Sequence, residues 1–157
     1  YTIALRILEN REEAEEAVQD AFVKMYRALS DFHFDSKFST WFYRIVYRTA
    51  LTALRQQRMF VSYEEAGPVD LSNDEVESAT ALLEREDRKE MIARTLKLPA
   101  DEALLLTLYY LEECSVEEIC QITELSASNV KVKLFRGRKR FYEVLQDKMK
   151  LETADLL

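Results

Sequence analysis

Glycine, proline and histidine are scarce in this chain of 157 residues, which contains two glycines, two prolines and one histidine. Tight turns draw on glycine and proline, so a β-sandwich or β-barrel of this length would need many more of them. Long stretches rich in Ala, Leu, Glu and Arg favour helix instead. The sequence therefore excludes an all-β fold and predicts an all-α protein.

Cysteine is equally scarce, since only Cys114 and Cys120 are present. No histidine stands near them, so their spacing fits no zinc site, and we expect two ordinary thiols in a reducing, cytoplasmic compartment. The longest nearly apolar run, Ala103 to Leu111, is about half the roughly 20 residues that a membrane span needs. We expect no membrane insertion and no secretory leader. The abrupt start at Tyr1, inside an apolar stretch, predicts that an N-terminal segment is missing.

Groupings that carry catalysis are also missing from the sequence. It has no paired carboxylates with a base, no nucleophile–histidine pair, no metal-ligand spacing and no glycine-rich phosphate loop. We therefore predict no enzyme activity, no metal site, no cofactor and no small-molecule substrate.

Charge, by contrast, is plentiful and segregated within a net charge of −7. Residues 36–63 hold five bases and no acid, and residues 127–140 hold six bases and no acid. Between them, residues 64–90 hold ten acids and three bases. Two basic segments on helical patterns indicate contact with a polyanion such as nucleic acid.

Hydrophobic periodicity predicts a small helical bundle in the first half of the chain. Asn10 is placed to cap a helix over 11–29, and Ser39 to cap a helix that runs to about residue 58. A shorter helical segment over 1–8 completes the bundle.

The second half predicts several helices after an acidic connector. Ser115 and Ser126 are placed to cap two of them. The predicted helices lie near 74–96, 100–112, 116–122 and 127–148. The predicted organisation is two small helical domains over 1–60 and 78–150, a flexible acidic linker over 61–77 and a tail over 151–157. Such a linker implies domains that move relative to each other unless a partner clamps them.

The spacing of the last two helices is that of a helix-turn-helix, with a short helix, a turn of about four residues and a longer second helix. On the second helix, Val130, Leu134 and Phe141 form an inward stripe. Lysine and arginine on its free face suit phosphates and guanine, and Val132 and Phe135 suit thymine methyl groups. Taken alone, this pattern also fits a solvated basic helix on a bundle.

Two blocks of sequence together resemble a known family. Leu98-Pro99, Leu104 to Leu111, Ser115 to Cys120 and Ser126 to Arg140 resemble region 4 of bacterial sigma factors. Ala14 to Phe22 resembles region 2.2, and Phe38 to Ile45, closing with Leu54-Arg55, resembles regions 2.3 and 2.4. The order of the blocks, the acidic linker and the lack of a region 3 domain resemble the extracytoplasmic-function (ECF) class, group 4 of the sigma-70 family, over about residues 1–148.

The resemblance implies a protein that binds core RNA polymerase and directs it to a promoter. Region 2 would dock on the β′ clamp helices through Gln19, Asp20 and Phe22, although Phe22 also fits the core stripe of its helix. Region 4 would contact the β flap. An anti-sigma factor is a further implied partner.

The resemblance also implies two sets of DNA contacts. Region 2 would melt and read the −10 element with the loop Asp31 to Phe38 and the residues Phe38, Trp41, Tyr43, Arg44, Arg48 and Arg55. Region 4 would read the −35 element with Ser128, Asn129, Lys131, Val132, Lys133, Phe135, Arg136, Arg138 and Lys139. Within this second set, we expect Lys133, Arg138 and Lys139 to hold phosphates.

Four positions depart from the family pattern. Family members often carry Asn where this chain has Arg48, and Asn or Asp where it has Thr52. The helix-turn-helix turn usually has glycine where Glu124 stands, so we expect a differently shaped turn, because a left-handed non-glycine residue costs about 1 kcal/mol. Gly137, often alanine in relatives, weakens its helix by a similar amount and suggests close packing there.

Two other interpretations of the sequence stay open. A standalone helix-turn-helix regulator would bind paired half-sites on duplex DNA, as a dimer and without polymerase. A helical interaction protein would only sequester a partner, which makes the two basic segments hard to explain. If the chain is a sigma factor, the acids of 64–90 are expected to repel nucleic acid until polymerase separates the domains.

Overall fold

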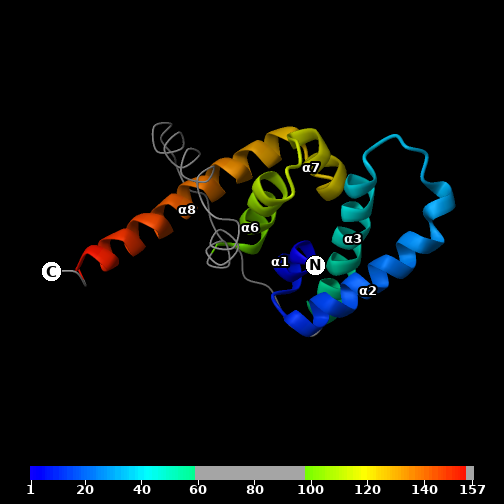
Figure 1. Ribbon diagram of the computed structural model, residues 1–157, viewed down its shortest axis with the longest axis horizontal. Helices are drawn as coiled ribbons and strands as arrows, with labels where there is room; N and C mark the ends of the chain where they lie inside the picture. The colour runs from blue at the N-terminus through cyan, green and yellow to red at the C-terminus, as the bar shows by residue number, and fades with distance from the viewer. Residues whose placement is uncertain (59–97, 155–157) are drawn as a thin grey trace.

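The computed structural model describes residues 1–58 and 98–154, and every regular element in these ranges is helical (Figure 1). The all-α prediction is therefore confirmed. The predicted linker over 61–77, the predicted helix over 74–96 and the acids of 64–90 lie outside the described residues.

The first half consists of α1 (Thr2–Leu8), α2 (Arg11–Arg27), a short 3-10 turn, η1 (Leu29–Asp31), and α3 (Phe38–Arg58). As predicted, Asn10 caps α2, and its side chain accepts a hydrogen bond from the Glu13 N–H at 3.2 Å. The buried residues of α2 are all alanines, namely Ala14, Ala17 and Ala21. Their small side chains let α2 lie close against α1 and α3, the helices that it contacts.

The start of α3 differs from the prediction that Ser39 is its cap. The helix begins at Phe38, and the Lys37 carbonyl accepts the first hydrogen bond, from the Trp41 N–H at 3.1 Å. Ser39 therefore lies inside the first turn. Lys37 therefore lies just before the helix, and its side chain pairs with Glu118 of the second half of the chain.

The second half consists of α6 (Ala100–Leu106), a π-helical turn, η2 (Thr107–Leu111), α7 (Val116–Thr123) and α8 (Ala127–Ala154). Helix α8 runs beyond its predicted end near residue 148. No glycine or proline follows Gly137 in the sequence, and the terminal residues include good helix formers, so nothing breaks the helix before Ala154.

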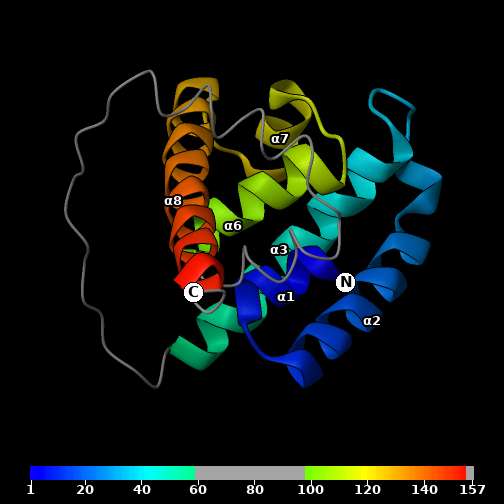
Figure 2. The same cartoon turned by 60° about the vertical axis from the view of Figure 1, so that its left-hand side comes forward.

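The two halves pack against each other, in contrast to the expected mobile domains. Helix α1 lies against α6, and α3 lies against α7, as Figures 1 and 2 both show. Their buried apolar residues form one cluster that extends from Ile3 to Phe141. Within this contact, Arg6 Nε donates a hydrogen bond to Thr107 Oγ1 at 3.3 Å. Shared apolar burial thus joins helices that the sequence assigned to separate domains.

Cys114 and Cys120 are free thiols, one buried and the other half-buried. Burial, with the nearby charges of Glu118 and Glu112, raises the pKa of Cys114 to about 11. Of the helices that the structure describes, none combines the length and apolar character required to cross a membrane.

Candidate nucleic-acid interface

Helix α8, the recognition-helix candidate, begins at a polar cap. Ser126 Oγ accepts a hydrogen bond from the Asn129 N–H at 3.2 Å, which satisfies one free amide of the first turn. Val130 and Leu134 are buried, as the predicted inward stripe requires. The opposite face of the first turns is exposed at Ser128, Asn129, Lys131 and Val132. These predicted −35 residues are open to solvent.

The other predicted −35 residues are half-buried, and Lys133 and Arg138 bind side chains of α6 and η2. Lys133 Nζ pairs with Asp101, and Arg138 Nε donates to Tyr110 Oη at 2.8 Å. The Arg138 guanidinium also lies 5.3 Å from the centroid of the Tyr109 ring. Burial by itself would raise the pKa of Asp101, but the hydrogen bond and charge of Lys133 leave it below its ordinary value. The remaining members of the set are Phe135, Arg136 and Lys139.

The turn before α8 has a left-handed residue, although this chain has Glu124 where relatives usually have glycine. Ser115 and Glu118 first form the predicted capping box of α7, with N–H···O distances of 3.2 and 2.8 Å. The helix ends at Thr123, and Glu124, the cap residue that follows it, has φ 63° and ψ 16°. The expectation of a differently shaped turn is therefore wrong, because Glu124 adopts the strained conformation itself, at about 1 kcal/mol.

Gly137 lies where α8 and α6 come into close contact. A Cβ atom there would lie 3.2 Å from Cγ and Cδ1 of Leu106 and 3.4 Å from Cβ of Glu102. Both residues are buried, so Leu106 could move away from a new Cβ only against its packed neighbours. The glycine lets the two helices approach, which confirms the close packing inferred from the sequence.

Aromatic rings gather at the start of α3 and in the loop before it. The Phe32 ring lies 4.9 Å from Trp41, 5.6 Å from Phe38 and 4.7 Å from Phe34, measured between centroids. Phe34 is 84% exposed and has a left-handed backbone with φ 62°. Phe32 and Phe34 lie in the loop Asp31 to Phe38 that the resemblance implies for base reading, but only Phe38 and Trp41 were named individually. The sequence signal for these two was their large apolar side chains in a loop, where polar residues are expected.

The polar side chains near the start of α3 meet acids of the second half. Tyr43 Oη donates to Glu112 Oε2 at 2.5 Å. The pKa of Tyr43 is raised strongly, mainly by burial and in second place by this hydrogen bond. Lys37 Nζ lies 2.9 Å from Glu118 Oε1, and Thr40 Oγ1 donates to the same oxygen at 3.3 Å. The pKa of Glu118 is lowered, mainly by the hydrogen bond that its carboxylate accepts from the Ser115 N–H and in second place by the hydrogen bond from Lys37.

Further along α3, the Arg48 guanidinium pairs with the Glu124 carboxylate, in the turn just described. Arg55 is exposed and Arg44 is half-buried. The structure therefore places the predicted −10 residues on one helix and its preceding loop, with two of them, Tyr43 and Arg48, held by acids.

The residues predicted to contact polymerase lie on α2. Gln19 and Asp20 are exposed, and Phe22 is 50% exposed with its ring centroid 4.9 Å from that of Phe42. Phe22 is thus a surface residue and not part of the core stripe.

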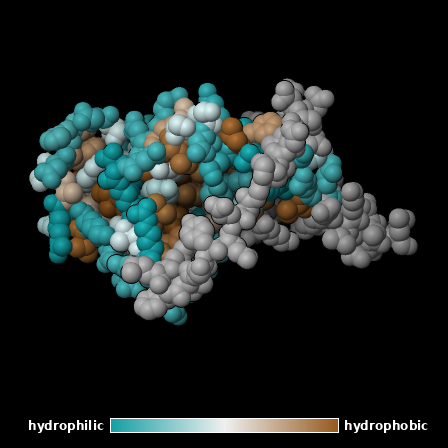
Figure 3. All heavy atoms as spheres, turned by 180° about the vertical axis from the view of Figure 1, so that it is seen from behind, coloured by the Kyte–Doolittle hydropathy of each residue, from teal (hydrophilic) through white to brown (hydrophobic). Residues whose placement is uncertain are grey.

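Figure 3, which shows the molecule from behind, has hydrophobic patches within a largely hydrophilic surface.

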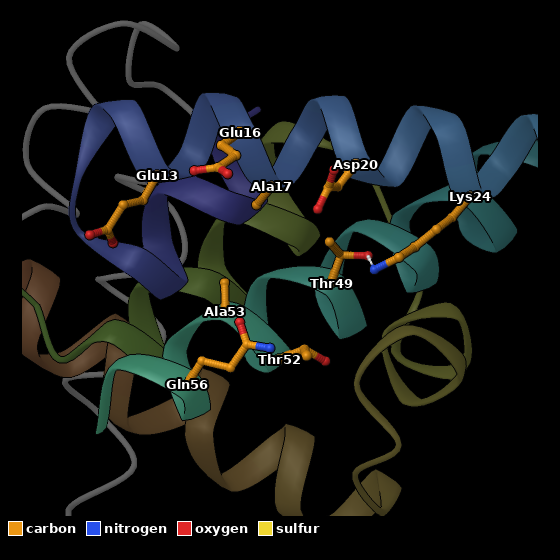
Figure 4. Close-up of a pocket in the computed structure, with 9 residues that line it drawn as sticks. All are labelled: Glu13, Glu16, Ala17, Asp20, Lys24, Thr49, Thr52, Ala53 and Gln56. Carbon is orange, nitrogen blue, oxygen red and sulfur yellow. Dashed lines mark hydrogen bonds between the residues drawn. The ribbon is translucent and has the colours of Figure 1, made fainter. Parts of the chain in front are cut away.

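An open groove of about 510 Å³ runs between α2 and α3 (Figure 4). Glu13, Glu16 and Asp20 line it from α2, while Lys24 Nζ donates across it to Thr49 Oγ1 at 3.2 Å. The groove and the exposed Asp20 give this side of α2 an acidic surface, which suits a basic protein partner.

Comparison with known proteins finds two family models in the chain. The model "Sigma-70 region 2" matches residues 1–59, and the model "Sigma-70, region 4" matches residues 88–141. The ECF RNA polymerase sigma factor SigW of Bacillus subtilis is 30% identical over 155 residues, covering 94% of this chain and 83% of the relative. The RNA polymerase sigma-H factor of Pseudomonas aeruginosa is 32% identical over 152 residues, covering 92% and 79%.

A further relative and a solved structure agree with these matches. The ECF RNA polymerase sigma-E factor of Escherichia coli is 33% identical over 132 residues, covering 79% of this chain and 69% of the relative. The fold is similar to that of the sigma factor RpoE from Bartonella quintana, solved in complex with the anti-sigma factor NepR. That match has a TM-score of 0.68 at 19% identity and covers 92% of this chain and 88% of the other.

Proposed function

The chain belongs to the ECF sigma factors of the sigma-70 family, and we propose that it binds core RNA polymerase and directs promoter-specific initiation through two DNA-contacting units. Residues 1–60 form the unit for the −10 element and for polymerase, and residues 78–150 form the unit for the −35 element. The observation that carries this proposal is that both sigma regions match the chain in the order that the family requires. A standalone regulator would have no use for region 2, the first of these two regions.

At the −35 element, the reading residues are those exposed at the start of α8. Helix-turn-helix proteins contact base edges with the N-terminal part of the second helix, where Ser128, Lys131 and Val132 lie. Lys131 suits a guanine or a phosphate, and Val132 suits a thymine methyl group. Lys133 and Arg138 bind Asp101 and Tyr110 within the protein, and each has further N–H donors that suit a phosphate.

At the −10 element, the aromatic loop offers a surface for an unpaired base. Phe34 is 84% exposed and rests on Phe32, so its outer face is free for a stacking partner. Aromatic stacking is worth about 1–3 kcal/mol per base and tolerates any sequence. Arg55 is exposed further along α3 and suits the backbone phosphates of the same strand.

The wider role follows from the family. We propose a non-enzymatic cytoplasmic regulator held inactive by an anti-sigma partner, since RpoE from Bartonella quintana forms a complex with the anti-sigma factor NepR. On the polymerase side, we propose that Gln19, Asp20 and Phe22 contact the clamp helices of the β′ subunit, and that the second half contacts the β flap.

Co-elution with core RNA polymerase free of sigma tests the proposal without knowledge of the promoter. The full chain should elute with the polymerase on a sizing column, and Gln19→Ala combined with Asp20→Ala should weaken this binding at least about tenfold, or about 1.4 kcal/mol. Glu12→Ala, at an exposed acid on the same helix, is the matched control and should bind normally. Binding to duplex DNA without binding to polymerase would instead support the standalone regulator.

A further inference from the structure

Two consecutive tyrosines of the π-helical turn η2 hold the guanidinium of Arg138, on α8. Arg138 Nε donates to Tyr110 Oη at 2.8 Å, and its Cζ atom lies 5.3 and 5.6 Å from the ring centroids of Tyr109 and Tyr110. We propose that these two tyrosines, the arginine cradle, are positioning residues that preset Arg138 as a phosphate contact for promoter DNA. This inference rests on the proposed function of α8 in DNA binding.

The π-helical turn accounts for the shape of the cradle. Consecutive side chains of a regular α-helix point about 100° apart and do not face each other. In η2, the Glu112 N–H instead donates to the Thr107 carbonyl, five residues back, at 3.1 Å. The rings of Tyr109 and Tyr110 lie 4.9 Å apart with 69° between their planes, so together they form two walls around one guanidinium. Single π-helical turns of this kind occur frequently at functional sites.

The cradle holds the cation without neutralising its charge. Arg140, on the same helix, pairs with the buried Glu102 carboxylate at 2.9 Å, which offsets its positive charge. A phenol is uncharged at neutral pH, and the face of its ring attracts a cation. The bond to Tyr110 uses Nε, so it leaves the two terminal nitrogens, which form the fork that binds a phosphate. Arg138 therefore keeps its charge and its fork while the cradle restricts its rotamers.

The place of Arg138 along α8 suits a contact at the edge of the major groove. Seven residues, close to two helical turns, separate it from the exposed Lys131, so the two residues lie on the same side of the helix. This spacing puts Arg138 about 10 Å further along the helix axis. The major groove is about 12 Å wide, so a side chain that far from the first reading residues reaches the bordering phosphates. A preset rotamer also reduces the entropy that the arginine loses on binding.

Along this part of the molecule, α6 and α8 lie side by side, as Figure 2 shows. Because η2 continues directly from α6, the cradle is fixed to the helix that supports α8 from within. Arg138 is thus held by the same scaffold that orients the reading helix.

Salt-dependent binding of duplex DNA by the full chain tests the cradle without knowledge of the promoter. Phosphate contacts are independent of sequence, and each adds about 0.9 to the slope of log binding constant against log salt concentration. Fluorescence anisotropy with a fluorescein-labelled duplex of mixed sequence measures this slope.

The cradle variant and its control each remove one tyrosine hydroxyl. Tyr110→Phe removes the acceptor that holds Arg138 and keeps the ring. Tyr142→Phe is the matched control, because its hydroxyl on α8 also accepts a side-chain hydrogen bond, from Gln146 at 2.6 Å. Thermal unfolding followed by circular dichroism checks that both variants fold.

Arg138→Ala should weaken duplex binding about tenfold at about 100 mM salt and lower the slope by about 0.9. Tyr110→Phe should weaken binding about threefold and lower the slope in the same direction, while Tyr142→Phe changes neither quantity. In the Arg138→Ala background, Tyr110→Phe should have no further effect, because a positioning residue acts only through the group that it positions.

Three results would overturn the cradle. Wild-type binding by Tyr110→Phe, beside weakened binding by Arg138→Ala, would leave Arg138 as a phosphate contact that needs no positioning. A further loss from Tyr110→Phe in the Arg138→Ala background would mean that the tyrosine acts through packing instead. Unchanged binding and slope in Arg138→Ala would contradict both the cradle and the proposed phosphate contact at this position.

Discussion

Arg48 on α3 and Glu124 in the turn before α8 form an ion pair between the two halves of the chain. Both stand at positions where the sequence departs from the residues frequent in sigma factors, asparagine at the first and glycine at the second. Their pairing gives one physical account of both departures. Glu124 has a strained left-handed backbone, and from this position its carboxylate binds Arg48.

Glycine at position 124 should make the protein more stable than alanine does. Glu124→Ala keeps the left-handed strain and removes the ion pair, so we expect a loss of about 0.2–1 kcal/mol in the free energy of unfolding. Glu124→Gly also removes the pair but relieves about 1 kcal/mol of strain. Urea unfolding should therefore rank the glycine variant about 1 kcal/mol above the alanine variant. Equal stabilities would show that the backbone at this position carries no strain.

The contact at Glu118 should weaken in acid. Its pKa is lower in the folded protein than the ordinary value of about 4.3, because the Ser115 N–H and Lys37 favour the ionised form. A lowered folded-state pKa adds stability above the ordinary value, and this stability is lost as the pH falls through the lowered pKa.

Glu118→Gln keeps a capping side chain for Ser115 but has no titrating charge. The melting temperature of the wild-type chain should therefore exceed that of the variant at about pH 7, and the gap should close toward about pH 3. A gap that stays constant over this range would mean that the charge of Glu118 contributes nothing.

Removing the ring of Phe34 should affect DNA opening and leave folding intact. Its side chain is 84% exposed, so Phe34→Ala should change the free energy of unfolding by no more than about 0.5 kcal/mol. Loss of one stacked base should weaken binding of single-stranded promoter DNA by the polymerase complex about tenfold. Phe34→Tyr keeps the ring and should bind like the wild type. If alanine and tyrosine bind equally well, Phe34 does not stack on a base.

Alanine at position 137 should destabilise the protein despite being a better helix former. The new Cβ would lie 3.2 Å from Leu106, which is fully buried, and overpacking of this kind costs about 1–3 kcal/mol. The gain in helix propensity is about 1 kcal/mol, so we expect a net loss of about 1 kcal/mol in urea unfolding. In a Leu106→Ala background the space is free, and there the same substitution should stabilise.

Local elements were predictable from the sequence because their signals are local. The caps at Asn10, Ser115 and Ser126, the inward stripe of α8 and the all-helical class all follow from nearby residues. The prediction of Ser39 as a cap is wrong because α3 begins at Phe38, after Lys37, whose side chain has no oxygen to cap the helix and so gives no start signal in the sequence.

The arrangement of the two halves was not predictable in the same way. Residues as far apart as Tyr43 and Glu112 are neighbours only in the folded chain, and in the sequence each resembles an ordinary surface residue. The acidic linker, the strongest charge signal between the halves, suggested mobile domains, and the acids after η2, in α7 and in the following turn formed no visible pattern. Phe34 lies inside the predicted base-reading loop Asp31 to Phe38, but the sequence does not single it out, because exposed apolar rings cannot be told from buried ones without the fold.

Glu124 also ties the shape of the helix-turn-helix to the packing of the two halves. The residue that closes the turn before α8 is the same residue that pairs with α3. A substitution chosen only to relax the backbone of the turn therefore also changes a contact between the halves.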